Sequence, residues 1–107
     1  MKSVSASELS AWLADKDRPP PVLLDVREPW ETQICRIEGS ELVPMQALPG
    51  RLSELDPDRP VVCICHLGGR SMQVALFLTR QGFKDAYNLT GGVDAWARQV
   101  DTAMPTY

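Results

Sequence analysis

Cys65 is the residue whose surroundings best suit covalent chemistry. It ends the apolar run Val61–Cys65 and is followed by His66-Leu67-Gly68-Gly69-Arg70-Ser71. Two adjacent glycines let a loop turn its backbone N–H groups inward, and these groups, with the dipole of a following helix, stabilise a negative sulfur. The pattern favours a thiolate nucleophile that needs no dedicated base. A strand, a cysteine, a loop and a helix in this order fit sulfurtransferases, protein phosphatases and arsenate reductases alike.

Several charged side chains could support this cysteine. Arg70 can orient an anionic donor or pair with a carboxylate such as Asp25 or Glu28, and closing the loop is the favoured role. Asp25 and Arg27 follow another apolar run and are expected to brace the site, with catalysis by Asp25 as the minority alternative. His66, the single histidine, either assists proton transfer or is a partly solvated spacer, and we favour the spacer.

The other two cysteines have less specific surroundings. Cys63 lies on the same face of its strand as Cys65 and is expected to fill the core, with a second redox thiol as the alternative. Cys35 is expected to be an incidental, semi-exposed thiol, and its alternative role is to resolve the persulfide by forming a disulfide. Together with His66 these cysteines make a nominal zinc set, but a C-x-C-H run lacks the geometry of structural zinc sites. We therefore expect neither a metal nor an organic cofactor.

Short apolar runs alternate with amphipathic stretches along the chain, which predicts an α/β fold whose parallel sheet is covered by helices. Strands are expected at 22–26, 41–43, 60–65 and 86–88, and helices at 28–33, 47–55 and 71–81. A first helix is expected to begin at the capping box Ser5–Glu8 and to end before Arg18, and a last helix should follow Gly91-Gly92 and carry Val93, Trp96, Ala97 and Val100 on one face. The unbroken apolar character of 22–26 and 60–65 is typical of strands buried on both faces, and the second should be central. Ligands bind at the carboxyl edge of such sheets, where Cys65 would lie.

Two of the expected helices have distinct apolar patterns. Ser5–Glu8 forms a capping box, after which Leu9, Trp12 and Leu13 should face the core. The stretch 71–81 is apolar on almost every side, which predicts a buried helix.

Length and charge exclude several classes of protein. The 107 residues predict a single domain spanning 1–107. The net charge of −3 and the absence of a basic run argue against nucleic acid and anionic membranes as partners. The longest apolar runs are far shorter than the roughly 18 residues of a membrane span. An odd number of cysteines and a polar N-terminus together predict a chain kept in a reducing cytoplasm.

Four separated blocks of the chain resemble the rhodanese family of thiosulfate sulfurtransferases. They are Leu24-Asp25-Val26-Arg27-Glu28-Pro29-Trp30-Glu31, then Gly39 with Pro44, then Cys65-x-x-Gly68-x-Arg70-Ser71, and finally Gly82-Phe83 with Tyr87-Asn88-Leu89-x-Gly91-Gly92-x-x-Ala95-Trp96. The resemblance implies a three-layer α/β/α domain on a five-stranded parallel sheet. It also implies that Cys65 accepts a sulfane sulfur and becomes a persulfide.

The resemblance assigns roles to neighbouring residues. His66, Leu67, Gly68, Gly69 and Arg70 would form the loop that binds the persulfide and its substrates, while Asp25, Arg27 and Ser71 would support it. Independently of the resemblance, Trp12, Trp30 and Trp96 are expected to be core or capping aromatics, and of the three Trp30 is the best candidate to edge the pocket. The chain departs from the family at Cys35-Arg36-Ile37-Glu38, where Gly-His-Ile is usual, so the shape of this segment is expected to differ.

Loop length separates the competing chemistries. Cys65 through Arg70 is six residues, the length found in sulfur-transferring members, whereas the related phosphatases carry one residue more. The prediction is therefore an enzyme that moves sulfur from a donor such as thiosulfate to cyanide or a thiol.

One alternative is a persulfide relay that acts with protein partners. The ending Val100-Asp101-x-x-x-Pro105-x-Tyr107 is similar to the ends of rhodanese domains joined to adenylating enzymes of sulfur-carrier pathways. Two further alternatives are disfavoured. Loop length argues against a phosphatase or arsenate reductase, and the presence of Cys65 argues against a non-catalytic module.

Overall fold

A sheet of five parallel strands forms the centre of the computed structural model, which describes residues 1–107. The strands are Lys2–Val4 (β1), Val22–Asp25 (β2), Glu41–Leu42 (β3), Val61–Ile64 (β4) and Ala86–Leu89 (β5). Their spatial order is β1-β5-β4-β2-β3, and every neighbouring pair is parallel. The α/β class and the central place of β4 are thereby confirmed.

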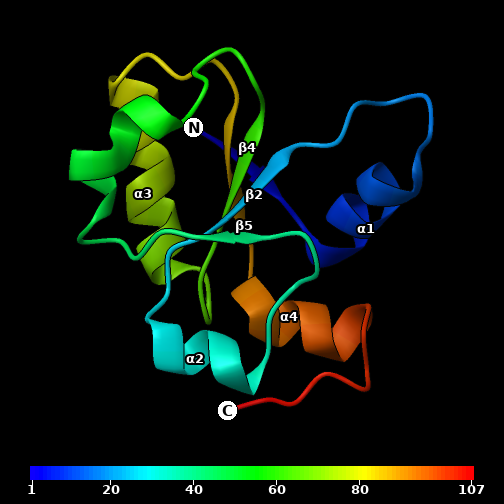
Figure 1. The fold of residues 1–107 in the computed structure, drawn as a ribbon. Helices are drawn as coiled ribbons and strands as arrows, with labels where there is room; N and C mark the ends of the chain where they lie inside the picture. The colour runs from blue at the N-terminus through cyan, green and yellow to red at the C-terminus, as the bar shows by residue number, and fades with distance from the viewer.

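Helices cover both faces of this sheet (Figure 1). They are Ala6–Ala14 (α1), Pro29–Ile34 (α2), the 3₁₀ helix Leu48–Glu54 (η1), Gly69–Arg80 (α3) and Gly92–Gln99 (α4). In Figure 1, α1 and α4 lie on one side and α3 on the other, while α2 lies beside the end of the chain. The three-layer α/β/α arrangement is confirmed. None of these helices is both long and apolar enough to span a membrane.

Side chains of the central strand alternate between two separate cores. Val62 and Ile64 pack with α1 and α4, whereas Val61, Cys63 and the following Cys65 pack with α3. This alternation follows from the period of two along a strand. It explains why β4 reads as an unbroken apolar run, since both of its faces are buried.

The structure contains one strand that the sequence did not predict. β1 is only three residues long and pairs with β5 from Lys2↔Tyr87 to Val4↔Leu89. Only Val4 of these three residues is buried. A three-residue edge strand with one apolar side chain gives no periodic signal, so its pairing partner decides its structure.

Three helix predictions need correction. α3 begins at Gly69, two residues before the expected start. It is not buried on every side, because Met72 and Leu76 are exposed on the surface away from the sheet, and Leu13 of α1 is exposed in the same way. The expected helix at 47–55 is a 3₁₀ helix instead. Its sequence carries a proline and a glycine early on, which disfavour a regular α-helix.

Candidate active site

Cys65 lies immediately after the central strand, between the ends of its two neighbours. Ile64 is in register with Asp25 of β2, and Cys63 with Asn88 of β5. Segments that leave β2, β4 and β5 therefore meet at the carboxyl edge of the sheet. The side chain of Cys65 lies in this edge with only 1% of the residue exposed.

Two groups contact the sulfur atom. The backbone N–H of Gly68 donates to Cys65 Sγ at 3.1 Å, and Ser71 Oγ lies 3.1 Å from the same sulfur. The adjacent glycines predict that several loop amides converge here. In the structure one amide and one hydroxyl contact Sγ.

Ser71 links the sulfur to Asn88 on the neighbouring strand. Its hydroxyl donates to Asn88 Oδ1 at 2.5 Å. A serine hydroxyl has a single proton, so while Ser71 donates to Asn88 it can only accept from the Cys65 thiol. When the thiol loses its proton, the Ser71 hydroxyl can turn and donate to the thiolate. The arrangement thus has a partner for sulfur in both protonation states.

The shape of the loop depends on a glycine and on the start of α4. Gly68 has φ +105°, and a Cβ there would lie 3.2 Å from Gly91 N. The backbone N–H groups of Val93 and Asp94 donate to the carbonyls of Cys65 and His66, at 2.9 and 3.2 Å. These bonds draw both loop carbonyls toward α4.

Arg70 pairs with a carboxylate that was not among its expected partners. Its two terminal nitrogens donate to the two oxygens of Glu31, each at 2.8 Å. The expectation of Asp25 or Glu28 was wrong, because Asp25 is already bound to Arg27 at 2.7 Å. Glu31 lies in the first turn of α2 and is buried, which places its carboxylate within reach of the loop.

Arg27 forms a fully buried junction beneath the site. It donates to Asp25 through three hydrogen bonds from its side chain, to the Cys35 carbonyl at 2.8 Å and to the Tyr107 hydroxyl at 3.0 Å. A buried guanidinium needs this many partners, because an unpaired charge in the interior is very costly. Arg27 and Asp25 are thus placed to brace the neighbouring segments rather than to touch Cys65.

Tyr107 returns from the far end of the chain to cover the site. Its hydroxyl donates to Glu31 Oε1 at 2.8 Å, and its ring stacks on His66 with centroids 3.8 Å apart and an angle of 7°. Burial raises the pKa of Tyr107 to about 12, so it remains a donor at neutral pH. His66 is partly buried, in line with the expected partly solvated position, and the stack on Tyr107 holds its ring in place. Trp30 is 60% exposed and packs edge-on against Tyr107, with ring centroids 6.1 Å apart, so it lies at the rim of the site.

Three residues of this network were not predicted as part of the site: Glu31, Asn88 and Tyr107. Glu31 and Asn88 both occur in blocks that carried the family resemblance, and Asn88 is a polar residue within an apolar strand. Both signals could have identified them. Tyr107 belongs to the C-terminal pattern that favoured the persulfide relay, but that pattern does not place it at the site, because it lies 76 residues from Glu31 and 80 from Arg27.

The remaining cysteines do not contact the loop sulfur through hydrogen bonds. Cys63 is enclosed in the core, as expected, and burial raises the pKa of its thiol to about 12. Cys35 is buried too, so the expectation of a semi-exposed thiol was wrong. It ends α2 and packs with Ile37 in the core beneath α1 and α4. The nominal zinc set of three cysteines and His66 does not come together as a group of ligands.

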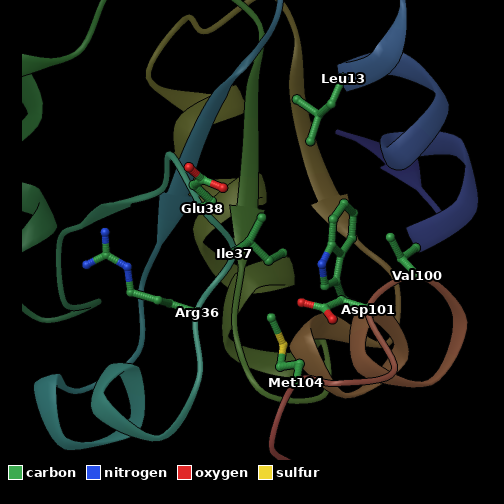
Figure 2. Close-up of a pocket in the computed structure, with 8 residues that line it drawn as sticks. Leu13, Arg36, Ile37, Glu38, Val100, Asp101 and Met104 are labelled. Carbon is green, nitrogen blue, oxygen red and sulfur yellow. The ribbon is translucent and has the colours of Figure 1, made fainter.

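A groove of about 450 Å³ lies away from Cys65 (Figure 2). Figure 2 shows Leu13, Ile37 and Met104 around it, with Arg36 and Glu38 at one side. Arg36, Ile37 and Glu38 of the segment that departs from the family pattern line this groove, whereas Cys35 lines a smaller hollow with His66 and Tyr107. Met104 packs the final stretch of chain here, shortly before the chain reaches His66.

The Glu31 carboxylate should make stability depend on pH. Its pKa is lowered from 4.5 to about 2, chiefly by the hydrogen bonds from Arg70. Because the folded-state pKa lies below the unfolded value, this stabilisation is complete above pH 4.5 and is lost as the pH falls toward 2. Glu31→Gln should therefore unfold at lower urea concentration than the wild type at neutral pH. The difference should narrow below pH 4.5, and a difference independent of pH would contradict this account.

Comparison with known families places this geometry in context. The profile of the rhodanese-like domain family matches residues 5–99, which leaves β1 and the stretch that carries Tyr107 outside the match. The chain is 38% identical over 98 residues to a sulfurtransferase of Allochromatium vinosum, and the match covers 92% of this chain and 90% of that one.

Two longer proteins contain a similar segment. The chain is 44% identical over 89 residues to rhodanese-like/PpiC domain-containing protein 12, chloroplastic, of Arabidopsis thaliana, and the match covers 79% of this chain and 30% of that protein. It is 36% identical over 107 residues to the probable adenylyltransferase/sulfurtransferase MoeZ of Mycobacterium tuberculosis, and the match covers 98% of this chain and 27% of that one. The chain thus spans less than a third of each.

The fold also matches that of solved structures. SSP1007 from Staphylococcus saprophyticus superposes with a TM-score of 0.84 at 33% identity, over 94% of this chain and 97% of that one.

Proposed function

The chain belongs to the family of rhodanese-like domains, and on this premise we propose that it is a sulfurtransferase in which Cys65 carries the sulfur. One observation supports this assignment above all: Cys65 Sγ receives the Gly68 N–H within a six-residue loop at the end of the central strand. Curated relatives named as sulfurtransferases support sulfur transfer in general.

The proposed reaction is a double displacement. The Cys65 thiolate attacks the outer sulfur of thiosulfate, the S–S bond of the donor breaks, and sulfite leaves with the bonding electron pair. Cys65 now carries a persulfide, Cys65–S–S⁻. Cyanide or a thiolate then attacks the terminal sulfur, and the thiolate of Cys65 is regenerated as the leaving group. Each step conserves charge and needs only the cysteine and its two substrates, so we propose no metal or organic cofactor.

The loop residues have distinct parts in this scheme. The Gly68 N–H and the Ser71 hydroxyl stabilise the negative sulfur, and the glycines let the backbone turn around it. His66, Leu67 and Arg70 would border the approach of the substrates, since Leu67 is exposed. Asp25 and Arg27 keep the neighbouring segments in place. Residues 1–107 would act as one domain, in a reducing cytoplasm where its three free cysteines stay reduced.

Intact mass spectrometry tests the first half of the reaction. The protein is reduced, freed of reductant and incubated with thiosulfate, and the expected result is a gain of one sulfur atom that cyanide removes. Peptide mapping should place the added sulfur on Cys65. A protein that gains no sulfur from any sulfane donor, yet hydrolyses aryl phosphates, would overturn the proposal in favour of the phosphatase class.

A second candidate function is a persulfide relay between proteins. The observation that favours it is the segment beyond the family match, which ends in Tyr107 stacked on His66 at the site. MoeZ, which joins adenylyltransferase and sulfurtransferase in its name, suggests a protein acceptor. The relay predicts slow turnover with thiosulfate and cyanide and fast sulfur transfer to a small acceptor protein whose C-terminal carboxyl is activated as an acyl-adenylate. The Cys65 persulfide attacks this carboxyl, AMP leaves, and a thiol reductant then cleaves the acyl disulfide to leave a thiocarboxylate on the acceptor. Equal rates with both acceptors would contradict it.

A further inference from the structure

The charges around Cys65 indicate which sulfur donors the site accepts. We infer that Glu31 is a specificity-determining residue: by neutralising Arg70, it makes Cys65 prefer donors with one negative charge, such as thiol persulfides, over the thiosulfate dianion. This inference rests on the proposed sulfur transfer and narrows its donor class.

Glu31 compensates Arg70 completely. Both guanidinium nitrogens that face α2 donate to the two carboxylate oxygens, in the bidentate arrangement that gives the strongest Arg–carboxylate pairs. The carboxylate is fixed by two more donors, the Glu28 N–H at 2.9 Å and the Tyr107 hydroxyl at 2.8 Å. Its side chain is only 4% exposed. Glu31 therefore cannot swing away when an anion arrives without leaving these donors unpaired.

Glu31 is also ionised whenever the enzyme would work. Its pKa of about 2 keeps it anionic across the neutral range. The hydrogen bonds to Glu31 are the largest influence on the pKa of Arg70 and raise it, and the charge of Cys65 contributes less. The guanidinium thus interacts with the reacting sulfur, but its charge is already matched by the carboxylate.

The other arginines beside the loop are neutralised in the same way. Arg27 is buried against Asp25, and Arg98 of α4 pairs with Asp94, whose backbone holds the His66 carbonyl. A thiosulfate dianion approaching the Cys65 thiolate thus meets repulsion from sulfur, while Arg70, Arg27 and Arg98 are each already paired with a carboxylate. A donor with one negative charge meets half of that repulsion.

Two thiosulfonyl donors test how the charge of the donor affects its reaction with Cys65, because they differ in charge and both react by breaking an S–S bond. Thiosulfate carries two negative charges and releases sulfite; methanethiosulfonate carries one and releases methanesulfinate. In each case the Cys65 thiolate gains the outer sulfur and the leaving group takes the electron pair. We expect wild-type kcat/KM, measured by persulfide formation in stopped flow, to be higher for methanethiosulfonate.

Glu31→Gln keeps a hydrogen-bonding side chain of the same shape and removes the charge. It should raise kcat/KM for thiosulfate relative to methanethiosulfonate by about tenfold, the effect of one charge at short range in a partly screened site, with the change mainly in KM. The matched control is Glu54→Gln, which removes the carboxylate of the Arg51–Glu54 pair on η1 and should leave the ratio unchanged. If Glu31 had a merely structural role, the substitution would lower kcat/KM for both donors by the same factor, and this result would overturn the inference.

A measurement on the wild type covers the case in which Glu31→Gln does not fold. The rate with thiosulfate should rise with ionic strength more steeply than the rate with methanethiosulfonate, because salt screens the repulsion between anions. A thiosulfate rate that falls with salt would reveal an uncompensated cation and refute the inference. Failure of both donors to load Cys65 would instead refute the proposed function itself.

Discussion

Cys65→Ser is expected to abolish persulfide formation and to lower sulfur transfer by at least about 10³-fold, the scale on which loss of a covalent nucleophile acts. A serine hydroxyl at this position can keep the contacts to Gly68 and Ser71, but it cannot form a persulfide. The fold should therefore survive while the chemistry is lost. The measurements are intact mass after incubation with thiosulfate and the rate of thiocyanate formation from cyanide.

The other two cysteines provide controls within the same protein. Cys35→Ala and Cys63→Ala each remove a buried thiol without adding a buried hydroxyl, and each should load sulfur as the wild type does. Each substitution should instead lower Tm, because it leaves a small cavity in a packed core. Loss of loading in Cys35→Ala that matches Cys65→Ser would require a mechanism with two thiols.

Gly92→Ala is expected to lower activity by about 10²-fold, because displacement of a reacting group by about 1 Å has an effect of this size. Gly92 has φ +60°, and a Cβ there would collide with the carbonyl groups of Cys65 and His66. The collision would push the loop away from α4 and break the bonds from Val93 and Asp94. The same change should lower the unfolding free energy by roughly 1–3 kcal/mol, as strain at positive φ does.

Gly50→Ala is the matched control for this substitution. A Cβ at Gly50 would have no atom within 4 Å, the residue has no positive φ, and it lies on η1. Activity and Tm should both stay close to those of the wild type. If Gly92→Ala kept full activity with a lowered Tm, the bonds between α4 and the loop would matter for stability alone.

The parts of the site that were predictable lie close together in the chain. The order of strand, Cys65, glycines and Arg70 is a local pattern, and the apolar character of β4 identifies its central place. The position of Cys65 at the carboxyl edge then follows from the rules of parallel sheets. The capping box of α1 is equally local and is present in the structure.

What could not be predicted depends on contacts between distant segments. Asp25, Glu28 and Glu31 all lie near the same edge, and the choice of Glu31 by Arg70 depends on how α2 turns inward after Arg27 takes Asp25. β1 forms because β5 offers a free edge. Tyr107 reaches the site because the chain after α4 packs Met104 against the core beneath α1 and α4, and no short-range pattern encodes that route.

The burial of Cys63 has a consequence for how long a loaded protein can hold its sulfur. A thiolate next to a persulfide can discharge it by attacking the inner sulfur, closing a disulfide and releasing hydrosulfide. Cys63 is two residues from Cys65 on the same face of the strand, but burial raises the pKa of its thiol to about 12, so it stays protonated at neutral pH. The cysteine nearest to Cys65 in sequence therefore does not attack the persulfide, and the bound sulfur remains available to an external acceptor.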